Sequence, residues 1–580
     1  MASEPTSPGK TISANQVSGL SERGWSLLLG LVCLVVIFCN LGGAALFEPD
    51  EGRNAEKARE ILLLGDWVTP HENFLVTLDK PIFFYWLVAL SFKVFGISEW
   101  SARLPSALAA LGCVFLVYRF ARRHWGSWEA LWSCLILVTS LEFFMFSRIV
   151  IFDMILTFFI TLALSSFYTA ALAGDQKHRR LNFILMYAAM GAGTLVKGVI
   201  GVIVPGMVVI FYLLLTRKWF LLKSMNPLLG AVIYFSMVMP SYLWVELRNP
   251  GYLKYFFWQE HFARFVTPRF DRTKNWYYFF MVLGVGFLPW SFLLPIAVKD
   301  LRKHFFNDTT LFLALWAIVP FIFFSASDAK LPHYILPIFP ALAMATGQTV
   351  AIRMSGPRKR RWILYVPWIL TLGFVAYCLV GAVWPRVLAS EIRFAVTQQV
   401  VVVASYGAIM SGIYGSYLIG VIRGLWREAD AAYLCTCIGI ALFLLLSGQI
   451  VNASSFHRAA KSLTEETAPL IERPDQIVFY GTYLEGLPFY LRIDRPIWLV
   501  EARHRAEELG NSYVAERRRP APGYGQVVFG DGEFAEQWKR NQTVFRVFLK
   551  EKSLSRLSRE VDTAPRILAK LNEYFLVTNR

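Results

Sequence analysis

Acidic and basic residues alternate directly after the first long apolar run, residues 25–46. They begin with Glu48, Asp50, Glu51 and Arg53. A guanidinium one helical turn from a carboxylate keeps that carboxylate ionised, and an ionised carboxylate can orient or deprotonate an acceptor hydroxyl. Asp50 is therefore a candidate catalytic residue, with Glu51 in support. A second interpretation stays open, because an aspartate before a helical run is also a common N-cap.

A second charged group, Asp79-Lys80, precedes Pro81 and an aromatic cluster at 83–86. The Lys80 ammonium is a compact positive charge that suits a phosphate. His261, in an aromatic loop at 247–275, could bind a divalent metal ion together with Glu260 if another carboxylate such as Asp79 came near. A lone histidine in such a loop is more often an ordinary hydrogen-bonding residue, so both interpretations remain.

Further ionisable residues stand at the ends of later apolar runs. Asp153 lies just inside an apolar helix, where an unpaired carboxylate is costly, and we predict that Arg148, five residues earlier, is its partner. This pair has either a functional or a purely structural role. Lys197 sits between two short apolar runs, and Lys330 and Tyr334 open another run.

We expect these carboxylates, cations and the tyrosine to lie together at one face of a hydrophobic bundle. The set suits a ligand with a lipid tail in the membrane, a phosphate at the headgroup and a polar group outside. Cations at the phosphate would stabilise it as a leaving group. We therefore expect chemistry that needs no nucleotide cofactor.

The elements that must position these residues are membrane-spanning helices. Of the 580 residues, 56% are hydrophobic and only 17% are charged, against about 25% in a soluble domain. The net charge of +17 does not indicate nucleic acid, because the basic residues form short clusters between apolar runs, where they set orientation in a bilayer. The seven cysteines all lie in apolar segments and are interpreted as packing residues.

The predicted fold is an all-α polytopic membrane bundle of about 13 transmembrane helices. A spanning helix needs about 20 apolar residues, whereas residues 82–97 are fewer and are predicted to lie along the interface. With the N-terminus in the cytoplasm, alternate loops are basic, which places the C-terminus outside. The expected spans are 25–46, 100–120, 127–147, 150–173, 181–197, 199–216, 227–246, 276–298, 309–326, 331–352, 362–384, 398–421 and 431–450.

Three domains follow from composition. Residues 1–24 form a polar cytoplasmic tail, and residues 25–450 form the membrane domain, whose first outer loop is 47–99. From 451 to 580 the chain turns polar, and short β-like runs alternate with helical stretches. This pattern predicts a small soluble α/β domain on the outer face.

At these residues the sequence resembles the GT-C glycosyltransferases that use polyprenyl-phosphate sugars. It looks most like the aminoarabinose (4-amino-4-deoxy-L-arabinose) lipid A transferase branch, which is related to the protein O-mannosyltransferases. The resemblance covers roughly residues 45–345. It rests on Pro49-Asp50-Glu51 with Arg53, Gly65-Asp66-Trp67, Asp79-Lys80-Pro81 with Tyr85-Trp86, Ala102-Arg103-Leu104-Pro105-Ser106, Ser147-Arg148 with Asp153, Glu260-His261-Phe262, and Lys330-Leu331-Pro332 with Tyr334.

The resemblance implies roles for individual residues. Asp50 would be the catalytic carboxylate, with Asp153 supporting it. Arg53, Lys80 and Tyr334 would bind the donor phosphate, while Asp79 and His261 would hold a divalent cation such as zinc, magnesium or manganese. The sequence departs from the pattern of the branch at one point. The branch usually has Glu-Lys-Pro-Pro where this chain has Asp79-Lys80-Pro81-Ile82. This departure bears on the metal site and on the identity of the sugar.

We therefore expect a bacterial inner-membrane enzyme that acts as a monomer. It would transfer a sugar from undecaprenyl phosphate to lipid A or another envelope glycan at the periplasmic face. A protein acceptor, as in protein O-mannosyltransferases, is the alternative within this class. A transporter or flippase for a lipid-linked sugar is the alternative from another class, but transporters tend to show paired repeats, and no repeat is visible in this chain.

Overall fold

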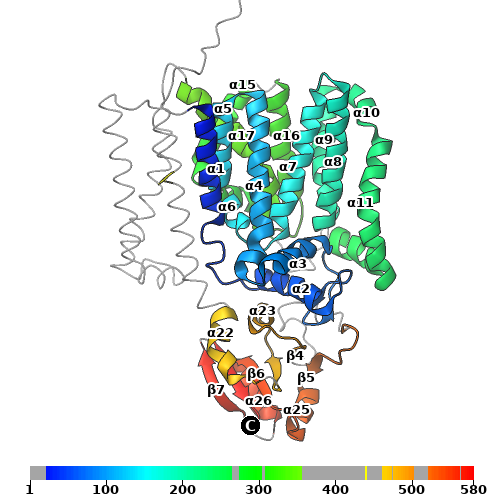
Figure 1. Cartoon of the computed structure of the whole chain (residues 1–580), viewed down its shortest axis with the longest axis vertical. Coiled ribbons are helices and arrows are strands. Elements are labelled where there is room, and N and C mark those ends of the chain that lie inside the picture. Colours follow the sequence, from blue (N-terminus) through cyan, green and yellow to red (C-terminus); the bar gives the residue numbers. More distant parts are fainter. Residues whose placement is uncertain are drawn as a thin grey trace, which may run out of the picture.

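The chain forms a helical bundle with a smaller α/β unit at one end (Figure 1). The computed structural model describes residues 21–263, 274–303, 307–355, 438–439, 460–472, 474–501, 520–561, 564–571 and 573–580, without the side chains of residues 259, 261–263, 301, 303, 355, 501 and 571. In this part of the chain, five helical segments are long and apolar enough to cross a membrane, and up to seven if each of two bent pairs is one span. The chain is therefore a multi-pass membrane protein. The five are α4 (Glu99–His124), α7 (Phe152–Ala171), α11 (Pro227–Arg248), α16 (Asp308–Ser325) and Pro332–Met354, which joins η4 (Pro332–Ile338) to α17 (Phe339–Ser355).

Two of the expected spans are broken rather than straight. Within 127–147 the chain bends by 67° between α5 (Ser127–Thr139) and α6 (Leu141–Ser147). Within 276–298 it bends by 107° after α14 (Tyr278–Gly286), where Pro289 cannot continue the helix. The spans expected at 362–384, 398–421 and 431–450 lie outside the described residues, except for residues 438–439. The remaining elements of the bundle are α1 (Glu22–Phe38), α8 (Gln176–Lys197), α9 (Ile200–Thr216), α10 (Phe220–Met225), α12 (Tyr252–Lys254), η2 (Tyr255–Ala263), η3 (Trp290–Leu293) and α15 (Leu294–Lys303).

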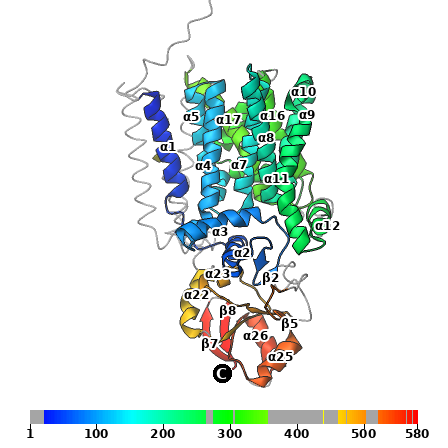
Figure 2. The same ribbon diagram turned by 45° about the vertical axis from the view of Figure 1, so that its right-hand side comes forward.

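Two helices of the first outer loop, α2 (Asp50–Leu64) and α3 (Phe83–Phe95), lie across the end of the bundle (Figures 1 and 2). The sequence favours α2 locally, since its first turn is acidic and Gly65 ends it with a φ of 67°, which costs glycine little. The orientation of α3 across the bundle agrees with the interfacial helix predicted for 82–97. The short strands β1 (His71–Glu72) and β2 (Leu75–Val76) form a hairpin between α2 and α3.

The C-terminal unit is built on a six-stranded sheet in the order β5-β4-β3-β6-β8-β7. Strands β5, β4, β3 and β6 are parallel, and β8 and β7 add to the β6 edge as antiparallel strands. Side chains alternate between two cores, with Phe479 on one face and Tyr480 on the other. The strands are β3 (Gln476–Tyr480), β4 (Trp498–Glu501), β5 (Val528–Gly530), β6 (Phe545–Lys550), β7 (Arg566–Leu571) and β8 (Tyr574–Thr578), and the helices are α22 (Ala460–Thr467), η6 (Ala468–Leu470), α23 (Leu487–Leu491), α25 (Asp531–Arg540) and α26 (Glu551–Glu560).

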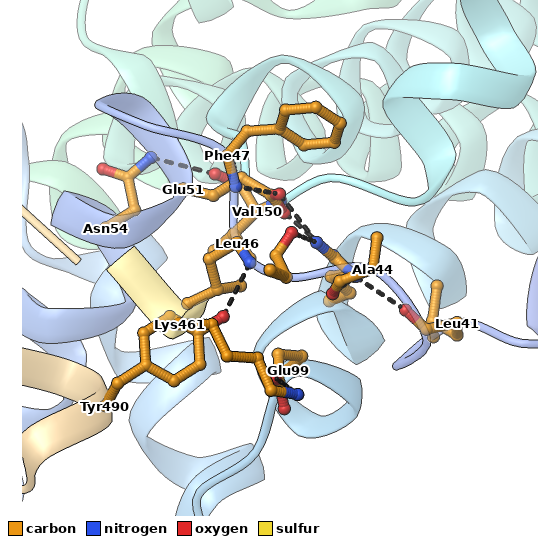
Figure 3. A network of polar contacts seen from close by, with 12 residues as sticks. Leu41, Ala44, Leu46, Phe47, Glu51, Asn54, Glu99, Val150, Lys461 and Tyr490 are labelled. Carbon is orange, nitrogen blue, oxygen red and sulfur yellow. Dashed lines mark hydrogen bonds and ion pairs between the residues drawn. The ribbon is translucent and has the colours of Figure 1, made fainter. Parts of the chain in front are cut away.

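The C-terminal unit is fastened to the first outer loop by polar contacts. Figure 3 shows the Tyr490 hydroxyl accepting a hydrogen bond from the Leu46 amide, at 2.7 Å, and Lys461 reaching Glu99 at 2.8 Å. Asn73 exchanges two hydrogen bonds with the Ile497 backbone, at 2.8 and 2.9 Å. The loop that carries the candidate site is therefore held between the bundle and the C-terminal unit.

Candidate active site

A cavity of about 180 Å³ lies between α2, the start of α7, the α8–α9 junction and the segment that leads into η4. It brings together most of the residues predicted to act on a ligand. Part of its wall is apolar, so the cavity is suited to an amphipathic molecule. Its ionisable and polar lining residues are Asp50, Arg53, Asn54, Asp79, Lys80, Asp153, Lys197, Glu260, Ser327, His333 and Tyr334, and its apolar ones are Ile151, Phe152, Leu156, Ile200, Phe323, Phe324, Ala329 and Leu331.

Helix α2 supplies the cavity with one charged face. Asp50, Arg53 and Lys57 are spaced by three and four residues and so share a side of the helix. The Asp50 side chain is 57% exposed and forms an ion pair with Nη2 of Arg53. Pro49 occupies the N-cap position and Asp50 stands at the first helical position, so the predicted role of Asp50 as N-cap is wrong. Its carboxylate stays open to the cavity.

Asp79 sits between cations behind this face. Its Oδ1 accepts a hydrogen bond from Lys57 Nζ at 3.0 Å, and the same ammonium lies 3.3 Å from Glu72. Burial alone would raise the pKa of the Asp79 carboxyl, but Lys57, Lys80 and Arg53 outweigh it and lower that pKa below its ordinary value. Asp79 is therefore ionised at neutral pH.

The Lys80 side chain is held by a backbone carbonyl and by a carboxylate from a distant loop. Its Nζ donates to the Asp79 carbonyl at 2.9 Å and to Glu260 at 3.5 Å. Glu260 is buried in η2 and also accepts from the Tyr255 hydroxyl at 3.3 Å. These contacts hold the Lys80 ammonium at the cavity, where it can meet an anion.

Asp153, in the first turn of α7, is paired with residues other than the one predicted. Its Oδ1 accepts from Lys197 Nζ at 2.5 Å, and His333 Nε2 lies 3.6 Å from Oδ2. Lys197 also lies 4.6 Å from the centre of the Tyr334 ring. The predicted Arg148–Asp153 pair is wrong, because Arg148 instead donates to the carbonyls of Val36, Ile37 and Cys39 at the end of α1.

Glu51, next to Asp50 in the sequence, faces away from the cavity into the protein. Both of its oxygens bind Arg103 of α4, at 2.9 and 2.8 Å, and both side chains are buried. Glu51 also accepts from the amides of Phe47 and Val150, the residues that flank it in Figure 3. The remaining donors of Arg103 go to carbonyls of Leu41, Ala44 and Ala45. Glu51 is thus a structural support, not a ligand-binding residue.

Lys330 likewise supports the cavity without lining it. Its buried ammonium donates to the Ser327 and Lys274 carbonyls, at 2.5 and 3.1 Å, and so fixes the segment that precedes Tyr334. The side chain of His261 lies outside the described part of the chain. Among the described residues, no three His, Cys, Asp or Glu side chains come together around a possible metal ion.

Sequence reasoning missed Lys57 and assigned no role to Arg103 or His333. It considered Glu260 as a metal ligand beside His261, not as the partner of Lys80. Lys57 had a signal, because it lies one turn beyond Arg53 on the same helical face. Arg103 had a weaker one, as an arginine near the start of an apolar helix that needs a buried partner. The placement of Glu260 and His333 depends on contacts between distant segments, which spacing alone does not reveal.

Comparisons with known proteins agree with this fold. The family model of dolichyl-phosphate-mannose-protein mannosyltransferases matches residues 79–244. The crystal structure of ArnT from Cupriavidus metallidurans bound to undecaprenyl phosphate superposes with a TM-score of 0.81 at 27% identity, covering 97% of this chain and 99% of that one. The fold is that of a membrane glycosyltransferase of the GT-C class.

Two relatives define the branch. An undecaprenyl phosphate-alpha-4-amino-4-deoxy-L-arabinose arabinosyl transferase of Edwardsiella ictaluri is 32% identical over 437 residues, which are 73% of this chain and 76% of the relative. The corresponding protein of Pseudomonas paraeruginosa is 35% identical over 337 residues, and that match spans 57% of this chain and 60% of the relative. The chain belongs to the family of undecaprenyl phosphate-aminoarabinose arabinosyl transferases.

Proposed function

We propose that this protein transfers 4-amino-4-deoxy-L-arabinose from undecaprenyl phosphate to lipid A. The bond between the sugar C1 and the phosphate oxygen breaks, and undecaprenyl phosphate leaves with the bonding electrons. A bond between C1 and an acceptor oxygen forms in its place. The relatives and the undecaprenyl phosphate complex described above support the donor, and lipid A is the acceptor that the resemblance of the sequence implies.

One observation carries the proposal. The cavity joins an exposed carboxylate, Asp50, to three cations, Arg53, Lys80 and Lys197, and continues into an apolar wall. A lipid-linked sugar phosphate needs all three kinds of surface: an acceptor side, a phosphate side and a side for the prenyl chain.

The chemistry divides among these residues. Arg53, Lys80 and Lys197, with Tyr334 beside Lys197, would bind the phosphate and stabilise the charge that develops on it as the sugar leaves. Asp50, paired with Arg53, would orient the acceptor oxygen or accept its proton. Asp153 would hold Lys197 toward the phosphate through the 2.5 Å contact.

A divalent cation is proposed as an addition to this site. Asp79 lines the cavity and is ionised, so it fits as a metal ligand through the oxygen that Lys57 does not contact, and His261 would be the second ligand. The ion would balance charge on the donor phosphate. Elemental analysis of purified protein should find zinc, magnesium or manganese, and the Asp79→Ala/His261→Ala variant should lose it. A metal content equal in both proteins would contradict these ligands.

The proposed setting is the inner membrane, with thirteen spans, a cytoplasmic N-terminus, a soluble periplasmic C-terminal domain and action as a monomer. The basic last turn of α4, with Arg122 and Arg123, supports this orientation, because it lies at the bundle end opposite the C-terminal unit in Figure 1. The cavity then opens toward the periplasm.

A protein acceptor is the second candidate, since the matching family model is that of protein mannosyltransferases. The test is expression of the wild type or of Asp50→Asn in a bacterium that lacks its own aminoarabinose transferase. Mass spectrometry should find aminoarabinose on lipid A with the wild type alone. Unmodified lipid A, with the wild type present in the membrane, would overturn the lipid A proposal, and modified envelope protein would then favour the second candidate.

A further inference from the structure

The C-terminal unit touches a residue of the active site. Glu485, in the loop between β3 and α23, places its Oε2 3.4 Å from Nε of Arg53. The Glu485 side chain is 3% exposed and that of Arg53 is 17% exposed. This ion pair therefore joins two parts of the chain that are more than 400 residues apart, at the edge of the cavity.

The backbone around Glu485 is pressed against the first turn of α2. The amide of Gly486 donates to Glu48 Oε1 at 2.9 Å. A Cβ atom added to Gly52 would lie 2.7 Å from the Gly486 Cα, so the two backbones approach too closely for any larger residue at Gly52. The loop that carries Glu485 is therefore held against the first turn of α2, so Glu485 does not follow the Arg53 side chain if that side chain moves.

The two partners of Arg53 contact different nitrogens of its guanidinium group. Glu485 contacts Nε on the side of the C-terminal unit, and Asp50 contacts Nη2 on the side of the cavity. Neither contact uses Nη1, and Arg53 lines the cavity. An arginine whose Nε lies beside a buried carboxylate has less freedom to rotate, which lowers the entropy lost when its remaining donors bind an anion.

We propose that Glu485 is a positioning residue, through which the C-terminal domain orients Arg53 toward the phosphate of the lipid-linked donor. The proposal rests on the proposed function for the identity of that donor. It gives the C-terminal domain a part in donor binding, in addition to its contacts with the outer loop. It also makes the active site incomplete in a chain that lacks the domain.

The experiment measures donor KM, kcat and direct binding of undecaprenyl phosphate to the purified full chain. Glu485→Gln keeps the shape of the side chain and removes its acidic group. We expect the donor KM and the Kd for undecaprenyl phosphate to rise about tenfold, as for the loss of one charge-assisted contact, with kcat within about twofold. Glu485→Asp keeps the charge one methylene farther away and should give a smaller rise, which provides a second variant if Glu485→Gln is unstable.

Two controls separate positioning from general stability. Lys461→Met removes a different contact of the C-terminal unit, to Glu99, and should leave the donor KM unchanged. In an Arg53→Lys background, Glu485→Gln should have no further effect on the Kd for undecaprenyl phosphate, because the guanidinium group that Glu485 orients is absent. Equal, additive effects in both backgrounds would mean a purely structural role and would overturn the proposal.

A lower KM in Glu485→Gln would also overturn it, since Glu485 would then compete with the phosphate for Arg53. The direct measurement of undecaprenyl phosphate binding keeps this test distinct from the test of the proposed function. A wild type that binds undecaprenyl phosphate but modifies no lipid A would refute the proposed function and leave the role of Glu485 measurable. An active wild type with unchanged donor binding in Glu485→Gln would refute this proposal alone.

Discussion

At the scale of the residue, two adjacent carboxylates have opposite surroundings. Asp50 is mostly exposed at the cavity, whereas Glu51 is buried against Arg103. The cause is helical geometry, because consecutive residues of α2 point about 100° apart. A charge-rich motif therefore contains both a residue that can meet the ligand and a residue that holds the helix in place.

The first prediction compares these neighbours. Glu51→Gln cannot accept both Arg103 contacts as a carboxylate does, and breaking a buried pair costs about 3–5 kcal/mol. We expect a clear drop in the thermal unfolding temperature of the detergent-solubilised protein. Asp50→Asn is the matched control, since its exposed pair contributes about 1 kcal/mol at most. Equal unfolding temperatures for the two variants would contradict the assignment of Glu51 to structure.

A second prediction concerns Lys57, whose buried ammonium serves both Asp79 and Glu72. Lys57→Met leaves two carboxylates without their shared cation, so the unfolding temperature should fall. Adding Asp79→Asn should recover part of that loss, with a coupling energy of about 0.5–3 kcal/mol in a double-mutant cycle. Lys93→Met, on the exposed side of α3, is the control and should change nothing. Strictly additive effects would show that Lys57 and Asp79 do not interact.

At the scale of the element, small residues let helices approach closely where apolar burial alone gives little guidance. Gly347 of α17 faces α5, and a Cβ atom there would lie 2.6 Å from the Ser133 Cα. Gly206 of α9 has open space around the same position. In a membrane, such close approaches replace much of the hydrophobic driving force between helices.

The third prediction follows from that contrast. Gly347→Ala forces α5 and α17 apart and should destabilise the protein by about 1–3 kcal/mol. Gly206→Ala should be neutral or slightly stabilising, because alanine favours a helix by about 1 kcal/mol over glycine. Thermal unfolding of the two variants beside the wild type measures both effects. A stable Gly347→Ala protein would mean that the α5–α17 contact can relax without cost.

The predictable elements are those with a local signal. The apolar runs indicated α4, α7, α11 and α16, and the short run at 82–97 indicated a helix lying across the bundle, as α3 does. Hydropathy did not predict the bends at Ser140 and Pro289, because bent and straight segments can have the same composition. Likewise, nearness in sequence suggested Arg148 for Asp153, whereas the observed partners, Lys197 and His333, come from other helices.

At the scale of the whole molecule, the C-terminal unit and the first outer loop share an acid-rich interface. Burial raises the pKa of Glu48 from 4.5 to about 8, against the opposing effect of the Gly486 amide. Arg53 and Glu51 on α2 and Glu485 on the facing loop are the charged groups nearby. Glu48 is therefore protonated in the folded protein under mildly acidic conditions.

The fourth prediction is a pH dependence of stability. Because the pKa of Glu48 is higher in the folded state than in the unfolded state, its contribution is fully present below about pH 4.5 and is lost as the pH rises through about 8. The unfolding temperature of the wild type should therefore fall more steeply across this range than that of Glu48→Gln, which mimics the protonated acid. The two curves should converge at low pH and separate at high pH. Glu485 is present in both proteins, but its pKa is raised by burial and also by the Glu48 charge, so the difference between the curves reports Glu48 together with its effect on Glu485. Parallel curves would show that Glu48 does not change its protonation on unfolding, and that the interface depends on shape instead of charge.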